Sequence, residues 1–178
     1  MEFTRNIDKY CEPLTGLYNS VLSISFSGEG GEPVTLAEAK YWGKIEQDSD
    51  DDIITALITA ARRMCEQFSG IGFITRTIEA GINNSNGGFA LPYGPITAGP
   101  SAVDTDGNTL DLIYNLGQIE SPSGRMVVTY TAGHSSLPEE LKTALKAQFL
   151  FLYQNRGEGA KGLSPIAEMI LAPLRVVV

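Results

Sequence analysis

Residues 50–70 read DDDIITALITAARRMCEQFSG, and residues 137–157 read LPEELKTALKAQFLFLYQNRG. In both stretches apolar side chains recur at the three- and four-residue spacing of an amphipathic helix. The first stripe consists of Ile53, Ile54, Leu57, Ile58, Ala61, Cys65 and Phe68. The second consists of Leu141, Ala144, Leu145, Gln148, Phe149, Leu152 and Tyr153, and Leu150 and Phe151 widen it. The two stripes predict helices at about 50–69 and 137–156, each with a face buried in a core.

Start and stop signals frame these helices and predict two shorter ones. Thr35 and Glu38 have the spacing of a capping box, which predicts a helix over about 35–44. Ser49 is the expected cap of the second helix, with the carboxylates of 50–52 at the positive end of its dipole. Pro138 suits a first helical turn. Ser164-Pro165 predicts a last helix over about 164–172, ended by Pro173.

Between the two helical blocks, from about 71 to 133, the pattern changes to that of strands and turns. Residues 83–88 form a cluster of turn-forming residues, and Asp104–Asn108 resembles a hairpin tip with Asp-Gly at its centre. Residues 126–130, MVVTY, are the most convincing strand. Residues 21–26 also suit a strand, but the glycines after them favour placing 1–31 in an N-terminal arm or extension that orders on a neighbouring subunit.

These patterns together predict an α+β fold that is mainly α. We expect a small antiparallel helical bundle with an inserted antiparallel β-sheet or hairpin region.

Composition limits the possible functions. The chain has 178 residues and a formal net charge of −8, so it lacks the clustered basic charge by which proteins grip nucleic acid. Residues 1–124 carry 7 Lys/Arg against 17 Asp/Glu, a balance of −10. Cys11 and Cys65 lack CxxC spacing and suit two reduced thiols. We expect no signal peptide and no membrane span.

The sequence contains no convincing catalytic, cofactor or metal site. Asp48, Asp50 and Asp52 begin like a calcium loop, but Ile53 and Thr59 occupy the positions that need Gly and Glu. His134 is the single histidine and lies in a loop without an acid–nucleophile arrangement. We therefore expect no catalytic residue, no cofactor and no metal, and a protein that is not an enzyme.

Two further pairs of residues admit simple structural interpretations. Arg62 and Arg63 have the charge to touch phosphate, yet a mixed polar helix face that includes Glu66 is the simpler interpretation. Tyr41 and Trp42 are interpreted as anchors, either in the core or at an interface.

The order of these blocks resembles the head–tail connector (adaptor, head-completion) proteins of long-tailed bacteriophages, over roughly residues 32–175. Thr131-Ala132-Gly133 leading to a helix begun by Pro138 is similar to the family, as is the closing segment Leu171-Ala172-Pro173-Leu174-Arg175. The sequence departs from the family in its long N-terminal segment 1–31. It also departs at 41–45, where the family more often has a basic, leucine-containing segment.

The resemblance implies a structural virion protein. Such proteins form a ring, expected to be dodecameric, that joins the capsid portal to the tail or stopper protein and lets DNA pass without specific binding. The expected location is the capsid–tail junction of the virion, and the host cytoplasm during assembly, with no membrane partner. The alternative is a DNA-packaging or other DNA-binding phage protein.

The resemblance also implies how the chain is organised. An arm (1–31) precedes a single connector domain (32–173), and a C-terminal tail follows at 174–178. Related connectors dock on the portal through a C-terminal segment. The partner-docking residues expected here are Leu174, Arg175, Val176, Val177 and Val178.

Overall fold

A computed structural model describes residues 21–28, 30–84, 88–115, 118–156 and 162–175. These residues form two compact units. One contains the described residues up to 30 together with the segment from 75 to 133, and we call it the β unit. The other contains 31–74 and the described residues from 134 onward, and we call it the helical unit.

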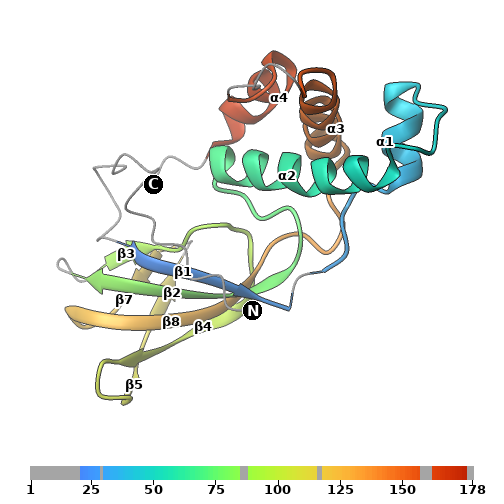
Figure 1. Ribbon diagram of the computed structural model, residues 1–178. Helices are drawn as coiled ribbons and strands as arrows, with labels where there is room; N and C mark the ends of the chain where they lie inside the picture. Colours follow the sequence, from blue (N-terminus) through green and yellow to red (C-terminus); the bar gives the residue numbers. More distant parts are fainter. Residues whose placement is uncertain (1–20, 29, 85–87, 116–117, 157–161, 176–178) are drawn as a thin grey trace. The chain divides into compact units, whose positions relative to one another are not determined.

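The β unit holds two antiparallel sheets (Figure 1). The larger sheet has the strand order β1-β2-β8-β4-β5, and the smaller has the order β3-β7-β6. The strands are β1 (Val21–Ser27), β2 (Arg76–Asn84), β3 (Gly88–Ala90), β4 (Ile96–Asp104), β5 (Thr109–Leu110), β6 (Ile113–Asn115), β7 (Gln118–Glu120) and β8 (Gly124–Ala132).

The pair β2–β8 forms the centre of the larger sheet. Both strands alternate buried and more exposed residues, which is the period of a pleated strand with one covered face. Their buried side chains lie opposite each other in register, as the pairs Ile78–Tyr130, Ala80–Val128 and Ile82–Met126. Phe89 and Ile119 of the smaller sheet belong to the same apolar cluster, so the two sheets share one core.

The turn at Asp104–Asn108 confirms the predicted hairpin tip between β4 and β5. The carboxylate of Asp104 accepts hydrogen bonds from the backbone N–H groups of Asp106 (2.9 Å) and Asn108 (2.8 Å). Gly107 has φ = 86°, a left-handed conformation that glycine adopts without strain. The Asn108 side chain and these backbone bonds lower the pKa of Asp104.

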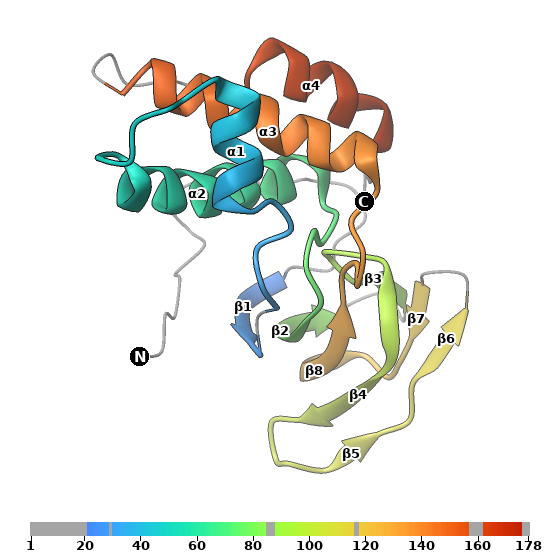
Figure 2. The ribbon, with the colours of Figure 1, turned by 90° about the vertical axis from the view of Figure 1, so that its right-hand side faces the viewer.

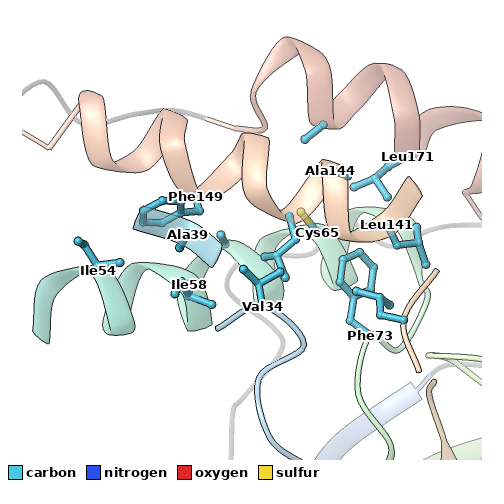
Figure 3. Packing of buried hydrophobic residues seen from close by; sticks show 14 residues of the cluster. Val34, Ala39, Ile54, Ile58, Cys65, Phe73, Leu141, Ala144, Phe149 and Leu171 are labelled. Atoms are coloured by element: carbon cyan, nitrogen blue, oxygen red, sulfur yellow. The ribbon is translucent and has the colours of Figure 1, made fainter. Parts of the chain in front are cut away.

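The helical unit contains α1 (Leu36–Gly43), α2 (Asp51–Ser69), α3 (Glu139–Gln154) and α4 (Pro165–Leu171), with a 3₁₀ turn η2 (Ala172–Leu174). The helix α3 packs against α1, α2 and α4. Figure 3 shows the apolar side chains that meet between them. Its fully buried members include Ala39 of α1, Ile54 of α2, Phe149 of α3 and Leu171 of α4, so one core joins all four helices.

The first helix begins as its sequence predicts. The Thr35 hydroxyl accepts from the Glu38 N–H at 3.2 Å, and the Glu38 carboxylate accepts from the Thr35 N–H at 2.8 Å. This is a complete capping box.

The predicted cap of α2 is wrong by one residue. The N-cap position is held by Asp50, not Ser49, and no side-chain capping bond forms there. The Asp50 carboxylate instead accepts from the Tyr153 hydroxyl at 2.8 Å and from Arg156 at 3.0 Å. These bonds tie the start of α2 to the end of α3.

The predicted fold class, mainly α with a small helical bundle, is wrong. The described part of the chain has four α-helices and eight strands in two antiparallel sheets, with 37% of residues in helices and 32% in strands. Two strands contain residues that normally indicate turns. β2 runs through Asn83 and Asn84, and β4 contains Gly99 and Pro100. β4 accommodates them because its register against β8 shifts in that region, as at a bulge.

Strand β1 confirms that residues 21–26 form a strand, which the sequence suggests within an arm. Here Val21–Ser27 pairs along β2 and forms one edge of the larger sheet. The division into arm, single connector domain and tail is otherwise still a prediction.

The Asp50–Tyr153 bond allows a test by titration. The Tyr153 hydroxyl first, and Arg156 second, lower the pKa of Asp50. A depressed native pKa contributes stability above the unfolded value of about 3.9, and this stability is lost as the pH falls through the native value. We expect Tyr153→Phe to raise the pKa of Asp50 toward the unfolded value, so that the stability from this group is smaller and is fully lost at a higher pH.

Carboxyl ¹³C NMR titration measures this shift. Asp104 serves as the internal control, because its hydrogen bonds come from its own hairpin. An unchanged Asp50 titration in Tyr153→Phe would contradict the assigned bond.

Candidate partner-binding surfaces

The C-terminal end of the helical unit carries the residues expected to dock on a partner. α4 begins with a side-chain cap, in which the Ser164 hydroxyl accepts from the Ala167 N–H at 3.1 Å. Its inner face buries Ala167 and Leu171. These contacts hold the closing segment of the chain against the rest of the helical unit.

Of the five expected docking residues, the structure describes Leu174 and Arg175; residues 176–178 lie outside the described residues. Leu174 is exposed and lines a shallow groove with Glu140, Thr143, Ile170 and Pro173. The Arg175 guanidinium lies over the ring of Phe68, 5.3 Å from its centroid. Docking through 174–178 is still a prediction.

The outer face of α4 and the turn η2 that follows it expose three apolar side chains. Met169 is 70% exposed, and Ile166 and Leu174 are also exposed. We call Ile166, Met169 and Leu174 the aliphatic patch. Helices usually place charged and polar side chains on such an outer face, so this patch is a candidate for contact with another protein.

A second exposed apolar surface lies on α1. Tyr41 is 89% exposed and Trp42 is 42% exposed. The Lys146 ammonium of α3 lies 5.0 Å from the centre of the Trp42 ring. We call Tyr41, Trp42 and Lys146 the aromatic patch. Of the two interpretations of Tyr41 and Trp42, core or interface, exposure excludes the core for Tyr41.

His134 has a structural contact. Its Nδ1 lies 2.9 Å from the carbonyl oxygen of Gly72, so Nδ1 carries the hydrogen and donates it. The bond joins the segment before α3 to the segment after α2. This geometry supports the interpretation of His134 as a loop residue.

Arg62 has a different place from the one its sequence suggests. The side chain is 1% exposed, not part of a solvated polar face. Its Nε donates to Glu32 at 2.9 Å, and its Nη1 donates to Glu66 at 3.1 Å. Glu66 also accepts from the Phe73 N–H at 2.8 Å. The network ties Glu32, which precedes α1, and Phe73, which follows α2, to the helix α2. Of the two arginines, only Arg63 is exposed.

The thiol of Cys65 is buried and free. Burial first, and the neighbouring Glu66 second, raise its pKa to about 12. It is therefore a core thiol that stays protonated and unreactive at neutral pH. Cys11 lies outside the described residues.

Within the described ranges, no group of three or more His, Cys, Asp or Glu side chains gathers closely enough to hold a metal ion. In the same part of the chain, no helix has the length and apolar character needed to cross a membrane.

Comparison with known proteins gives matches among solved structures. No family model and no curated protein matches the chain. A chain in the neck of an empty gene transfer agent (GTA) particle, computed with C6 symmetry, aligns with a TM-score of 0.66 at 19% identity, over 85% of this chain and 94% of that one. A chain in the virion of a native GTA particle aligns with a TM-score of 0.65 at 20% identity, over the same shares. A chain in the neck of a native GTA particle, computed with C12 symmetry, gives 0.59 at 18%, over 84% and 94%.

This chain has the fold of those GTA particle chains. The likeness covers most of both partners, so it includes the helical unit and the β unit together. We refer below to this shared fold as the GTA neck fold.

The sequence of this chain indicated the aromatic patch and not the aliphatic patch. Tyr41 and Trp42 stood out because two large aromatic residues follow each other in a short helix. Ile166 and Met169 did not, because a helix of seven residues is too short for its two faces to be told apart by periodicity.

Proposed function

We propose that this protein is a structural virion subunit that forms a ring at the head–tail junction, as a connector or adaptor. The observation that carries the proposal is the GTA neck fold, shared with chains from the neck and virion of GTA particles. Two of those neck structures were computed with rotational symmetry, C6 and C12, which is consistent with a ring of identical subunits. A twelve-subunit ring is the form we expect in the particle.

The charge of the chain supports passage of DNA through such a ring. A net charge of −8 repels phosphate, so DNA sliding through a channel formed by these subunits is not held by electrostatic attraction. The function is assembly by surface complementarity, with no bond made or broken. The portal on one side and a tail or stopper protein on the other are the proposed partners.

Removing the gene tests the proposal directly. Without the protein we expect DNA-filled heads that lack tails, and supplying the purified protein should restore complete particles. Electron microscopy of a labelled protein should place it at the junction. Normal particles made without the protein, or a label found elsewhere, would contradict the proposal.

The second test concerns the C-terminal tail. Deleting 175–178 should prevent attachment to portal-bearing heads and lower the thermal midpoint only slightly. The slight loss reflects the contact between Arg175 and Phe68, worth about 0.5–1 kcal/mol at an exposed site.

Two narrower variants show which part of the tail is responsible for attachment and which for the change in thermal midpoint. Arg175→Ala removes the ring contact alone, and deletion of 176–178 removes the valines alone. If the full deletion still yields infectious particles at normal efficiency, docking does not depend on this tail.

Binding to DNA separates the connector from a packaging protein. We expect only weak association at physiological salt, without sequence preference, because residues 1–124 carry a balance of −10. Fluorescence anisotropy over a range of salt concentrations measures it. A specific site bound at nanomolar affinity would support the DNA-binding alternative instead.

A further inference from the structure

The helical unit exposes two apolar patches that differ in chemistry and lie on opposite sides. α1 and α4 flank the central helix α3, one on each side of it (Figures 1 and 2). Each has an inner face in the common core, with Ala39 of α1 and Leu171 of α4 fully buried. The aromatic patch on α1 and the aliphatic patch on α4 therefore face away from each other.

We propose that the aromatic patch of one copy of this chain docks on the aliphatic patch of the next copy. The proposal rests on the proposed function, because it names the surfaces by which the ring subunits meet. Its occupant is a second copy of this chain, not the portal or a tail protein, so Leu174 belongs to this contact and portal docking is left to 175–178.

The composition of the two patches fits a protein interface. Tyr, Trp and Met are enriched at the buried centres of interfaces, and Tyr and Trp are frequent among the residues that contribute most to binding. Tyr41 and Met169 are the most exposed apolar side chains among the described residues. Beside the aliphatic patch, Leu174 lines a shallow groove with mainly apolar walls.

The charges around the patches are complementary. Lys146 belongs to the aromatic patch, and Lys44 is exposed at the end of the same helix α1. On the other side Glu168 is exposed on α4, and Glu140 lines the groove. Oppositely charged rims of this kind steer two surfaces into one register.

Each patch also has a neighbouring charge of the other sign, and that charge is already engaged within its own subunit. Glu38 accepts hydrogen bonds from Thr35 beside the aromatic patch. Arg175 stacks on Phe68 beside the aliphatic patch. Both keep their charge, but the two lysines outnumber Glu38 on one side and the two glutamates outnumber Arg175 on the other.

The arrangement also suits a ring. Contact between two different patches is heterologous and leaves each new copy with one open patch, so copies add in one direction and form a ring when the rotation between neighbours closes. Contact of one patch with itself would be isologous and would stop at a dimer.

Cysteine crosslinking tests the pairing of patches. We would place Tyr41→Cys and Met169→Cys together in a Cys11→Ser background and treat the protein with a short bismaleimide. Cys65 is buried and does not compete. The treatment is applied to the purified protein at high concentration and to purified particles, and products are resolved under denaturing conditions.

We expect the double variant to give a ladder of covalent multimers beyond the dimer in particles. Each single variant should give no ladder. The matched control pairs Met169→Cys with Ala56→Cys, an exposed position of α2 outside both patches, and should also give none. Unchanged thermal midpoints verify that each variant is folded.

The outcomes separate this proposal from the proposed function. If particles contain the protein at the junction but the double variant gives no ladder, the pairing is overturned and the ring function stands. Dimers from either single variant indicate an isologous contact and also overturn it. A crosslink to a different particle protein in place of a ladder assigns the patches to that protein. If the protein is absent from particles and gives no multimers in solution, both proposals fail.

Discussion

Replacing Phe149 by Ala should lower the free energy of unfolding by about 3–5 kcal/mol. The ring is completely buried on α3 and belongs to the core that joins all four helices (Figure 3). Truncation removes its transfer free energy and leaves a cavity that the surrounding helices fill only in part. Its ring also lies 6.0 Å from that of Tyr153, centre to centre, and this contact is lost. Chemical denaturation monitored by circular dichroism measures the change.

Tyr41→Ala is the matched control, since it also truncates an aromatic residue on a helix of the same unit. Tyr41 is almost fully exposed, so the expected change is within about 0.5 kcal/mol. Equal losses of unfolding free energy in the two variants would contradict the placement of Phe149 in the core and of Tyr41 at the surface.

Replacing Arg62 by Met should cost about 3–5 kcal/mol, an effect as large as that of a core truncation. Arg62 is buried between Glu32 and Glu66, and Glu66 is itself almost completely buried. Removing the cation takes the ion pair with Arg62 away from a buried carboxylate, which costs far more than the net contribution of the intact pair. Thermal and chemical unfolding of the variant measure the loss.

Arg63→Met is the control, because it changes the adjacent, exposed arginine in the same way. A second variant, Arg62→Met with Glu66→Gln, removes one of the two carboxylates that pair with Arg62 and should recover part of the loss. A single variant as stable as the parent chain would contradict the buried network.

The helices could be predicted from the sequence because each is defined within a continuous segment. The apolar stripe of α2 and the capping box of α1 depend on neighbours three or four residues away. Arg62 interrupts such a stripe, and its burial could not be predicted, because its partner Glu32 lies 30 residues earlier in the chain.

The strands were harder to predict because their stability depends on distant partners. Asn84 reads as a turn residue, yet its side chain is buried and donates to the Ser121 hydroxyl at 2.9 Å. This hydrogen bond satisfies the buried amide, so Asn84 can lie within β2. Nothing near Asn84 in the sequence indicates the bond. β-propensity reflects such packing more than an intrinsic backbone preference.

One of the two candidate surfaces could likewise be predicted from the sequence, and the other could not. Tyr41 and Trp42 stood out by residue type, whereas the aliphatic patch emerged only when Ala167 and Leu171 were seen to take the inner face of α4. The predicted docking tail is described only as far as Arg175.

The route of the chain through its two units has a consequence for biosynthesis. The β unit is encoded up to Gly133, and its last strand, β8, is finished before any residue of α3 has been made. The core between α2 and α3 needs partners separated by the whole of 75–133, so α1 and α2 emerge from the ribosome long before their apolar faces can be covered. The β unit is thus able to form first, during translation. The apolar faces of α1 and α2 stay uncovered until α3 and α4 have been made. Completion of the helical unit is then the last step before the subunit can meet its neighbours.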